Sequence, residues 1–232
     1  MPVTDRSAPT LTVDAARAHY DALGQGQDRE MRYAAPAFAR LIDNLDFTGV
    51  AQVVELGPGT GSFAEMLLGR HLSDDAAWLG LDVSTTMRDA AARRLSGFGD
   101  RAVLRDCAGD GGLALPDRSA DLVVATYVLD LLSADAIDRF LAESARVLRP
   151  GGQLAIAGLA PAAFSLAGIN MALWTVAHRL APRRVGGCRP VRIDSRLPDS
   201  LWQVTHRSTV RAAGIQSATL VARRAARASS CA

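Results

Sequence analysis

Apolar runs of four to six residues recur through the middle of the chain, and most precede a segment with helical spacing. The apolar runs are residues 52–56, 77–81, 102–105, 121–125 and 153–158, and the helical segments are 62–70, 85–95 and 134–148. Short strands that alternate with amphipathic helices are typical of βαβ units, in which helices cover both faces of a parallel sheet. The pattern therefore predicts an α/β fold with a doubly wound sheet.

The chain before the first strand has helical spacing. Residues 1–12 are polar and are expected to be disordered. Residues 13–23, which follow Thr12 as a plausible N-cap, and residues 28–45 predict two helices. We therefore expect a helical lead-in over 13–48.

The end of the chain predicts a hairpin. Residues 202–210 and 218–223 alternate polar and apolar positions on either side of a turn that contains Gly214. Strands so close in sequence must pair antiparallel. Since 232 residues suit one large domain, we predict a single domain over 13–225 with a tail at 226–232.

An insertion, residues 160–201, separates the last parallel strand from the hairpin, and its segment 163–180 predicts an unusually apolar helix. No charged residue occurs between Arg149 and Arg179, but a Gly-Gly pair and Pro161 interrupt this stretch, which favours a strand and a helix over a membrane span. The helix is either a lid that faces a lipophilic acceptor or a membrane, or ordinary core packing. The sequence leaves both interpretations open.

Composition excludes some chemistries. All 26 basic residues are arginine, so neither a Schiff-base lysine nor a P-loop lysine is present. The net charge of +2 gives no sign of a dedicated nucleic-acid binder. The segment from Ala181 to the end has ten arginines against two aspartates, a net charge of +8. This segment predicts either peripheral contact with an anionic membrane or a solvated tail.

The three cysteines are far apart and form no Cys-x-x-Cys pair, which argues against a disulfide framework and against a zinc site. We expect no metal ion. The first ten residues lack the apolar stretch of a signal peptide, so a cytoplasmic location is the default expectation. The sequence gives no indication of the oligomeric state.

A glycine-rich turn follows the first predicted strand, in the run Val53-Val54-Glu55-Leu56-Gly57-Pro58-Gly59-Thr60-Gly61. Glycines allow the backbone to approach a ligand closely, and the helix that follows offers free N–H groups and the positive end of its dipole. The next strand ends at Asp82, whose carboxylate can accept hydrogen bonds from both hydroxyls of a ribose. The Gly-x-Gly-x-Gly spacing differs from the Gly-x-Gly-x-x-Gly of dinucleotide sites, so NAD is disfavoured.

With three further motifs in the same order, these residues resemble class I S-adenosylmethionine-dependent methyltransferases, and among them the ubiquinone/menaquinone C-methyltransferase-like (type 11) group. The further motifs are Gly-Leu-Asp-Val-Ser-Thr-Thr-Met, Leu-Pro-Asp-Arg-Ser-Ala-Asp-Leu-Val-Val and Arg-Val-Leu-Arg-Pro-Gly-Gly-Gln-Leu. The resemblance implies a Rossmann-like sheet of seven strands, mostly parallel, with an antiparallel last strand. It also implies S-adenosyl-L-methionine as the cofactor.

The resemblance also assigns residues to that cofactor. Glu55 is expected near its methionine end, Asp82 at the ribose and Met87 against the adenine. An acidic residue after the third strand is expected to contact the adenine amino group, and it is either Asp106, the preferred candidate, or Asp110. The predicted cofactor set is Glu55, Gly57, Pro58, Gly59, Gly61, Asp82, Val83, Met87, Asp106, Cys107 and Thr126.

The acceptor is less well defined. Methyl transfer from a sulfonium is an in-line displacement, for which a general base is optional. Because ligands bind beyond the carboxyl ends of parallel strands, Tyr127 and Asp130 are candidate catalytic residues, together with Tyr20 and His178 on helices. We expect a small-molecule or lipid-like acceptor: a quinone ring carbon, a phospholipid amine, or a phenol or amine of a secondary metabolite. The alternative is a nonenzymatic module that only binds the cofactor.

Overall fold

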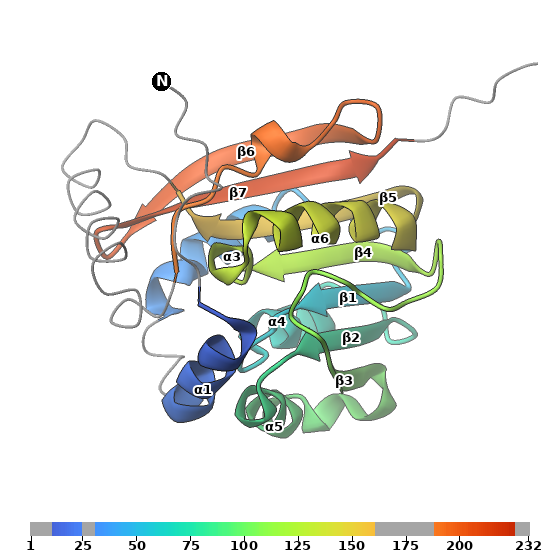
Figure 1. The fold of residues 1–232 in the computed structure, drawn as a ribbon. Coiled ribbons are helices and arrows are strands. Elements are labelled where there is room, and N and C mark those ends of the chain that lie inside the picture. Colours follow the sequence, from blue (N-terminus) through green and yellow to red (C-terminus); the bar gives the residue numbers. More distant parts are fainter. Residues whose placement is uncertain (1–10, 25–30, 161–187, 226–232) are drawn as a thin grey trace, which may run out of the picture.

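The computed structural model describes residues 11–24, 31–160 and 188–225, which form one sheet with helices on both faces (Figure 1). The seven strands lie in the order β3-β2-β1-β4-β5-β7-β6. Their bounds are β1 Gln52–Leu56, β2 Ala77–Asp82, β3 Ala102–Asp106, β4 Ala120–Thr126, β5 Leu148–Leu159, β6 Trp202–Ala212 and β7 Ile215–Arg224. The first five pair in parallel, whereas β7 pairs antiparallel with both β5 and β6. The predicted doubly wound sheet with an antiparallel last strand is confirmed.

The strand order reverses beside β1. The chain adds β2 and β3 on one side of β1 and then crosses back to add β4 on the other side. Connections that leave two neighbouring parallel strands in opposite directions open a crevice beyond the carboxyl ends of those strands. The topology therefore favours a ligand site beyond Leu56 of β1 and Thr126 of β4.

Helices cover the sheet on both faces. Figure 1 shows α6 on one face and α3 and α4 on the other. The described α-helices are α1 Val13–Leu23, α3 Ala35–Ile42, α4 Ser62–Arg70, α5 Thr85–Arg94 and α6 Ala134–Val147. Thr12, Ser84 and Ser133 cap α1, α5 and α6, because each side-chain oxygen accepts a hydrogen bond from the N–H three residues further on.

The second lead-in helix is shorter than predicted for residues 28–45. Met31–Ala34 form a 3₁₀ turn, and α3 covers only Ala35–Ile42. Pro36 lies in the first turn of α3, where its missing N–H costs no intrahelical hydrogen bond. Apolar spacing alone does not separate a 3₁₀ turn from an α-helix, so the prediction placed the start too early.

Two apolar layers hold the helices to the sheet. The layer on the side of α3 and α4 includes the fully buried side chains of Phe63, Leu67 and Trp78. The layer on the side of α6 includes Ile137, Phe140 and Leu154. Because helices cover both faces of the central strands, β1 and β4 are buried almost continuously along their length and not at every second residue.

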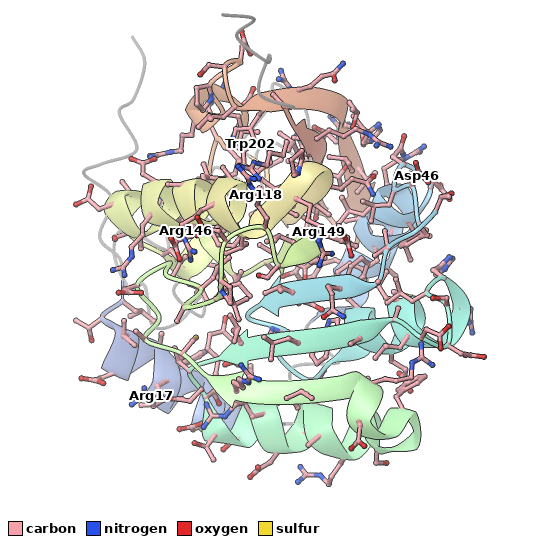
Figure 2. The ribbon with its side chains drawn as sticks, turned by 90° about the vertical axis from the view of Figure 1, so that its right-hand side faces the viewer. Arg17, Asp46, Arg118, Arg146, Arg149 and Trp202 are labelled. Atoms are coloured by element: carbon pink, nitrogen blue, oxygen red, sulfur yellow. The ribbon has the colours of Figure 1, made fainter. Side chains whose placement is uncertain are left out.

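Most described arginines of the basic C-terminal segment bind groups within the fold. Three form ion pairs: Arg196 with Asp138 at 2.6 Å, Arg207 with Asp194 at 3.3 Å and Arg223 with Asp46 at 3.0 Å. Figure 2 labels Asp46. Arg189 is buried, and Arg224 donates to a backbone carbonyl. The formal charge of this segment therefore overstates the charge that it presents to solvent.

The predicted apolar helix, residues 163–180, lies outside the described residues, as do His178, Arg183 and Arg184. Among the helices that the structure describes, none has the length and apolar character needed to cross a bilayer. The predicted contact with an anionic membrane therefore stays a prediction.

Two leucines test the assignment of the core. Leu154 in β5 is fully buried, whereas Leu201, just before β6, is 46% exposed. We expect Leu154→Ala to lower the free energy of unfolding by about 2–5 kcal/mol, because it leaves a cavity in a packed layer. The matched control Leu201→Ala should change it by less than about 0.5 kcal/mol. Urea unfolding followed by circular dichroism measures both values, and equal losses would contradict the assignment.

Candidate functional site

The turn after β1 consists of glycines in left-handed backbone conformations. Gly57, Gly59 and Gly61 have φ angles of 63°, 55° and 79°, which residues with a side chain rarely adopt. A Cβ on Gly57 would lie 2.4 Å from Cγ2 of Val128, so this glycine also lets the loop after β4 pack closely. Gly61 is the N-cap of α4, whose first N–H groups have no intrahelical acceptors. The turn therefore brings backbone donors to the crevice beside β1.

A cavity of about 920 Å³ lies at this crevice. The described residues that line it at the strand ends and in the loops include Gly57, Pro58, Gly59, Thr60, Asp82, Val83, Met87, Cys107, Asp110, Thr126 and Tyr127. The lead-in segment contributes Leu11, Thr12, Val13, Ala16, His19, Tyr20 and Leu23. Eight members of the predicted cofactor set thus share one cavity, whereas Glu55, Gly61 and Asp106 are not among the residues that line it.

Asp82 lies where β2 meets the cavity, and its side chain is held by two backbone groups. The N–H of Gly59 donates to Oδ2 at 3.2 Å, and the N–H of Ser84 donates to Oδ1 at 2.9 Å. Asp82 is 8% exposed, and burial raises the pKa of its carboxyl to about 6. A carboxylate accepts more than two hydrogen bonds, so Asp82 has capacity left for a ligand with hydroxyl groups.

Glu55 lies behind the cavity wall. Its carboxylate is fully buried and accepts hydrogen bonds from Nε1 of Trp78, at 3.0 Å, and from Oγ1 of Thr126, at 3.5 Å. Burial raises the pKa of Glu55 to about 7. Because Thr126 lines the cavity and Glu55 does not, the structure gives Glu55 an indirect position behind the Thr126 hydroxyl.

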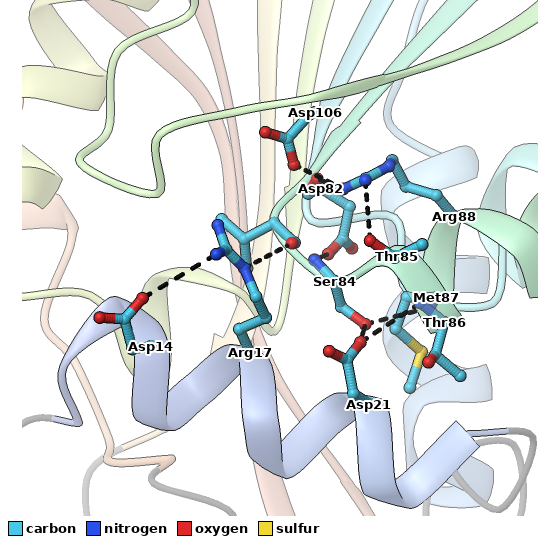
Figure 3. Close-up of polar contacts among 11 residues, drawn as sticks. Asp14, Arg17, Asp21, Asp82, Ser84, Thr85, Thr86, Met87, Arg88 and Asp106 are labelled. Carbon is cyan, nitrogen blue, oxygen red and sulfur yellow. Dashed lines mark hydrogen bonds and ion pairs between the residues drawn. The ribbon is translucent and has the colours of Figure 1, made fainter.

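The two acidic candidates after β3 lie in different places. The Asp106 side chain is 63% exposed and pairs with Nη1 of Arg88 at 2.7 Å (Figure 3). Asp110 lines the cavity, where Oδ1 accepts from the N–H of Gly112 at 2.9 Å and Oδ2 pairs with Arg139. Asp106 is the residue that the sequence favours for the adenine contact, but the residue that lines the cavity is Asp110.

Both candidate catalytic tyrosines, Tyr20 and Tyr127, line the cavity. Tyr127 has a φ of 56°, which is rare for a residue with a large side chain. Its hydroxyl donates to Oγ of Ser217 at 2.7 Å, and its ring meets that of Tyr33 edge-on at 5.4 Å. The hydroxyl of Tyr20 lies 3.7 Å from Sγ of Cys188. Burial raises the pKa of both tyrosines well above its usual value, so both hydroxyls are protonated at neutral pH.

Asp130 is not among the residues that line this cavity. The structure buries it to 2% exposure, and its Oδ2 accepts from the N–H of Leu159 at 2.8 Å. Its backbone oxygen accepts from the N–H of Arg189, which is also buried. Asp130 instead lines a second, smaller cavity of about 140 Å³. Its contacts are those of a residue that fixes the β5 end and the segment after the insertion.

Sequence reasoning named Tyr20 of α1 as a candidate but missed most of the other residues of α1 that line the cavity, and it missed the aromatic side chains of Tyr33, Phe38 and Phe63. Phe38 and Phe63 have their ring centroids 4.9 Å apart, and Phe38 also lies 6.2 Å from Tyr127. The signal available in the sequence was the amphipathic spacing of α1, and the structure adds that no residue of this helix is buried and that several of its apolar side chains line the cavity.

The sequence of this chain is similar to those of known methyltransferases. Residues 53–152 match the sequence profile of a family described as a methyltransferase domain. Trans-aconitate 2-methyltransferase of Methylobacterium nodulans is 36% identical over 129 residues, which are 56% of this chain and 45% of that protein. Demethylmenaquinone methyltransferase of Tropheryma whipplei is 33% identical over 112 residues, which are 48% and 43% of the two chains. The matched stretch spans about half the length of these curated relatives.

Solved structures extend the likeness to nearly the whole chain. The crystal structure of the [4+2]-cyclase SpnF has a TM-score of 0.69 and covers 94% of this chain and 98% of its own, at 17% sequence identity. At that identity the likeness shows the fold alone. That protein is named as a cyclase, whereas the sequence relatives above are named as methyltransferases.

Glu55 makes the stability of the ligand-free protein depend on pH. With its pKa raised from 4.5 to about 7, the folded protein keeps a proton that the unfolded chain releases between those values. Its contribution to the free energy of unfolding is therefore complete below about pH 4.5 and is lost as the pH rises through about 7. We expect the wild type to lose on the order of 1–3 kcal/mol more than Glu55→Gln between pH 5 and pH 8, because glutamine does not titrate.

Urea unfolding at the two pH values measures this difference. Glu65→Gln is the matched control, because Glu65 lies on the exposed face of α4 and its side chain is 53% exposed. This control should keep the pH dependence of the wild type. The prediction is wrong if Glu55→Gln and the wild type lose the same free energy over this range.

Proposed function

We propose that this chain, which belongs to the class I S-adenosylmethionine-dependent methyltransferases, transfers a methyl group from S-adenosylmethionine to a small, largely apolar acceptor. The observation that carries the proposal is a single cavity of about 920 Å³ with two unlike parts. The glycine turn and Asp82 form a polar part, and aromatic rings form an apolar part. Small-molecule sites usually measure about 300–1,000 Å³, so this volume is near the upper end of that range and leaves room for a donor together with a small acceptor.

The polar part fits the methyl donor. Left-handed glycines and the first turn of α4 offer N–H groups to a carboxylate, and Asp82 offers its remaining lone pairs to the ribose hydroxyls. The residues that would hold the donor are Gly57, Pro58, Gly59, Asp82, Val83, Met87, Cys107 and Thr126, with Glu55 and Gly61 behind them. When bound, S-adenosylmethionine supplies a methyl group activated by a positive sulfonium.

We assign the adenine amino group to Asp110 rather than Asp106. Both carboxylates pair with an arginine, but Asp110 lines the cavity and Asp106 does not. Cys107 lies between them on the cavity wall, and burial raises the pKa of its thiol to about 11. A neutral thiol is an apolar surface, which suits the flat face of a purine.

The apolar part indicates the acceptor class. Tyr33, Phe38, Phe63 and Tyr127 contact one another through their rings and form one aromatic wall of the cavity. Such a wall stabilises a ligand mainly by burying apolar surface. Among the acceptors expected from the sequence, a quinone ring or an aromatic phenol or amine fits this wall best. The relative named demethylmenaquinone methyltransferase is compatible with that class.

The chain's own residues would act by alignment and by excluding water. Tyr20 and Tyr127 stay protonated, so they position an acceptor through their rings and hydroxyls and do not remove a proton. Asp130 is not among the residues that line the cavity, and its Oδ2 accepts a hydrogen bond from the N–H of Leu159, so we do not assign it as a general base. Alignment of the nucleophile with the methyl group lowers the barrier without a base when the acceptor itself is sufficiently nucleophilic.

Asp82 gives a direct test of the donor site. Asp82→Ala should weaken the binding of S-adenosylhomocysteine by about 10- to 150-fold, which corresponds to the loss of about 1.5–3 kcal/mol from hydrogen bonds to a charged group. Asp89→Ala is the matched control, because Asp89 is exposed on α5. Isothermal titration calorimetry measures both affinities. Equal affinity in the wild type and Asp82→Ala would refute the site.

Turnover separates an enzyme from a module that only binds the donor. We expect the purified protein to transfer radiolabel from S-adenosylmethionine to a demethylated quinone or to an apolar compound of a cell extract, and Asp82→Ala to reduce that transfer at subsaturating donor. Aconitate and other small carboxylic acids should accept less label, because the aromatic wall offers them no charge. Donor binding without labelled product from any acceptor would favour the nonenzymatic alternative.

A further inference from the structure

Helix α1 covers the cavity without being anchored in the hydrophobic core. It lines the cavity through Val13, Ala16, His19, Tyr20 and Leu23, yet none of its residues is buried. Among the described residues, its polar contacts to the rest of the fold include the Tyr20–Cys188 contact and a group of contacts with one short stretch, the turn between β2 and α5 (Figure 3). Nε of Arg17 donates to the carbonyl oxygen of Val83 at 3.0 Å.

Asp21 makes the closest of these contacts. Its Oδ1 accepts a hydrogen bond from the hydroxyl of Ser84 at 2.5 Å and another from the N–H of Thr86 at 3.2 Å. The hydrogen bond from Ser84 lowers the pKa of Asp21, so its carboxylate is charged at neutral pH. A negative charge at this position also lies at the positive end of the α5 dipole. α1 is thus attached to the N-terminus of α5 by a charged side chain.

Ser84 connects Asp21 with the donor site. Its hydroxyl donates to Asp21 and accepts from the N–H of Met87, at 3.1 Å, while its N–H donates to Oδ1 of Asp82 at 2.9 Å. The other oxygen of Asp82 accepts from the N–H of Gly59. One network of hydrogen bonds therefore runs from α1 through the cap of α5 to the carboxylate that lines the cavity.

We propose that Asp21 is a positioning residue that couples the docking of α1 to donor binding. With Asp21 in place, Ser84 is fixed, Asp82 faces the donor, and α1 closes the cavity against water. Donor binding and α1 docking then stabilise each other by the same free energy, because coupling between two equilibria is reciprocal. The identity of the donor rests on the proposed function, whereas the coupling is a property of these residues.

The alternative, in which Asp21 only caps α5 and has no effect on donor binding, predicts a different result. If Asp21 only stabilised α5, its loss would lower the melting temperature of the ligand-free protein and leave the response of α1 to the donor unchanged. Amide hydrogen exchange in residues 13–23 distinguishes the two cases, because it reports local opening of α1 rather than activity.

The experiment compares the wild type with Asp21→Ala, Asp21→Asn and Asp14→Ala. Asp14 is the matched control, because its side chain lies on the same helix, is 93% exposed and makes only a 3.9 Å ion pair with Arg17. Calorimetry gives the affinity for S-adenosylhomocysteine, and hydrogen exchange with and without this ligand gives the protection of residues 13–23.

We expect the ligand to slow exchange in α1 of the wild type and of Asp14→Ala. Asp21→Ala should bind the ligand about tenfold more weakly and should lose most of this protection. Asp21→Asn should recover part of both effects, because its side-chain oxygen still accepts from Ser84 and Thr86. Unchanged affinity and protection in Asp21→Ala would overturn the coupling. If the wild type does not bind the ligand at all, the proposed function fails, and this inference fails with it.

Discussion

The buried carboxylate of Asp82 is the interaction on which the rest of the site depends. Its two oxygens bind the N–H of Gly59 in the turn after β1 and the N–H of Ser84 before α5. Two loops that are distant in sequence are therefore fixed relative to each other by one side chain. The left-handed glycines make this possible, because only such a backbone brings the N–H of Gly59 to the end of β2. Through Ser84 the same carboxylate also determines where α1 attaches.

Burial of two carboxylates costs stability that the fold recovers only in part. The pKa of Asp82 is raised to about 6 and that of Glu55 to about 7, mainly by burial, and their hydrogen bonds from N–H and O–H groups only partly offset this. Groups with such an unfavourable environment are common at binding sites, where side chains are placed to bind a ligand rather than to stabilise the ligand-free fold. A positively charged donor next to these residues would favour their ionised forms, so the cost that they impose is regained on binding.

The sequence was a good guide wherever a local backbone requirement determined the structure. The glycine turn, the place of Asp82 at the end of a strand and the alternation of strands and helices depend on residues that are adjacent or nearly so, and all were predicted. The position of Asp106 was not, because it depends on a contact with Arg88. The packing of α1 was missed for a similar reason: Asp21 and Ser84 are 63 positions apart, and Tyr20 and Cys188 are 168 apart. Apolar spacing predicts that a helix exists, but it does not predict which surface the helix covers.

The aromatic wall explains how similar donor sites can serve different acceptors. Tyr127 keeps a left-handed φ because its N–H bonds to Ala157 at 2.7 Å and its hydroxyl bonds to Ser217, so the wall is held rigid from both ends of the residue. A rigid apolar wall selects by shape, and one methylene changes selectivity by only about 10- to 200-fold. Relatives with names as different as trans-aconitate 2-methyltransferase and demethylmenaquinone methyltransferase match about half of this chain. We propose that acceptor choice in this chain follows from the few side chains that shape the wall, whereas the glycine turn and Asp82 bind the donor.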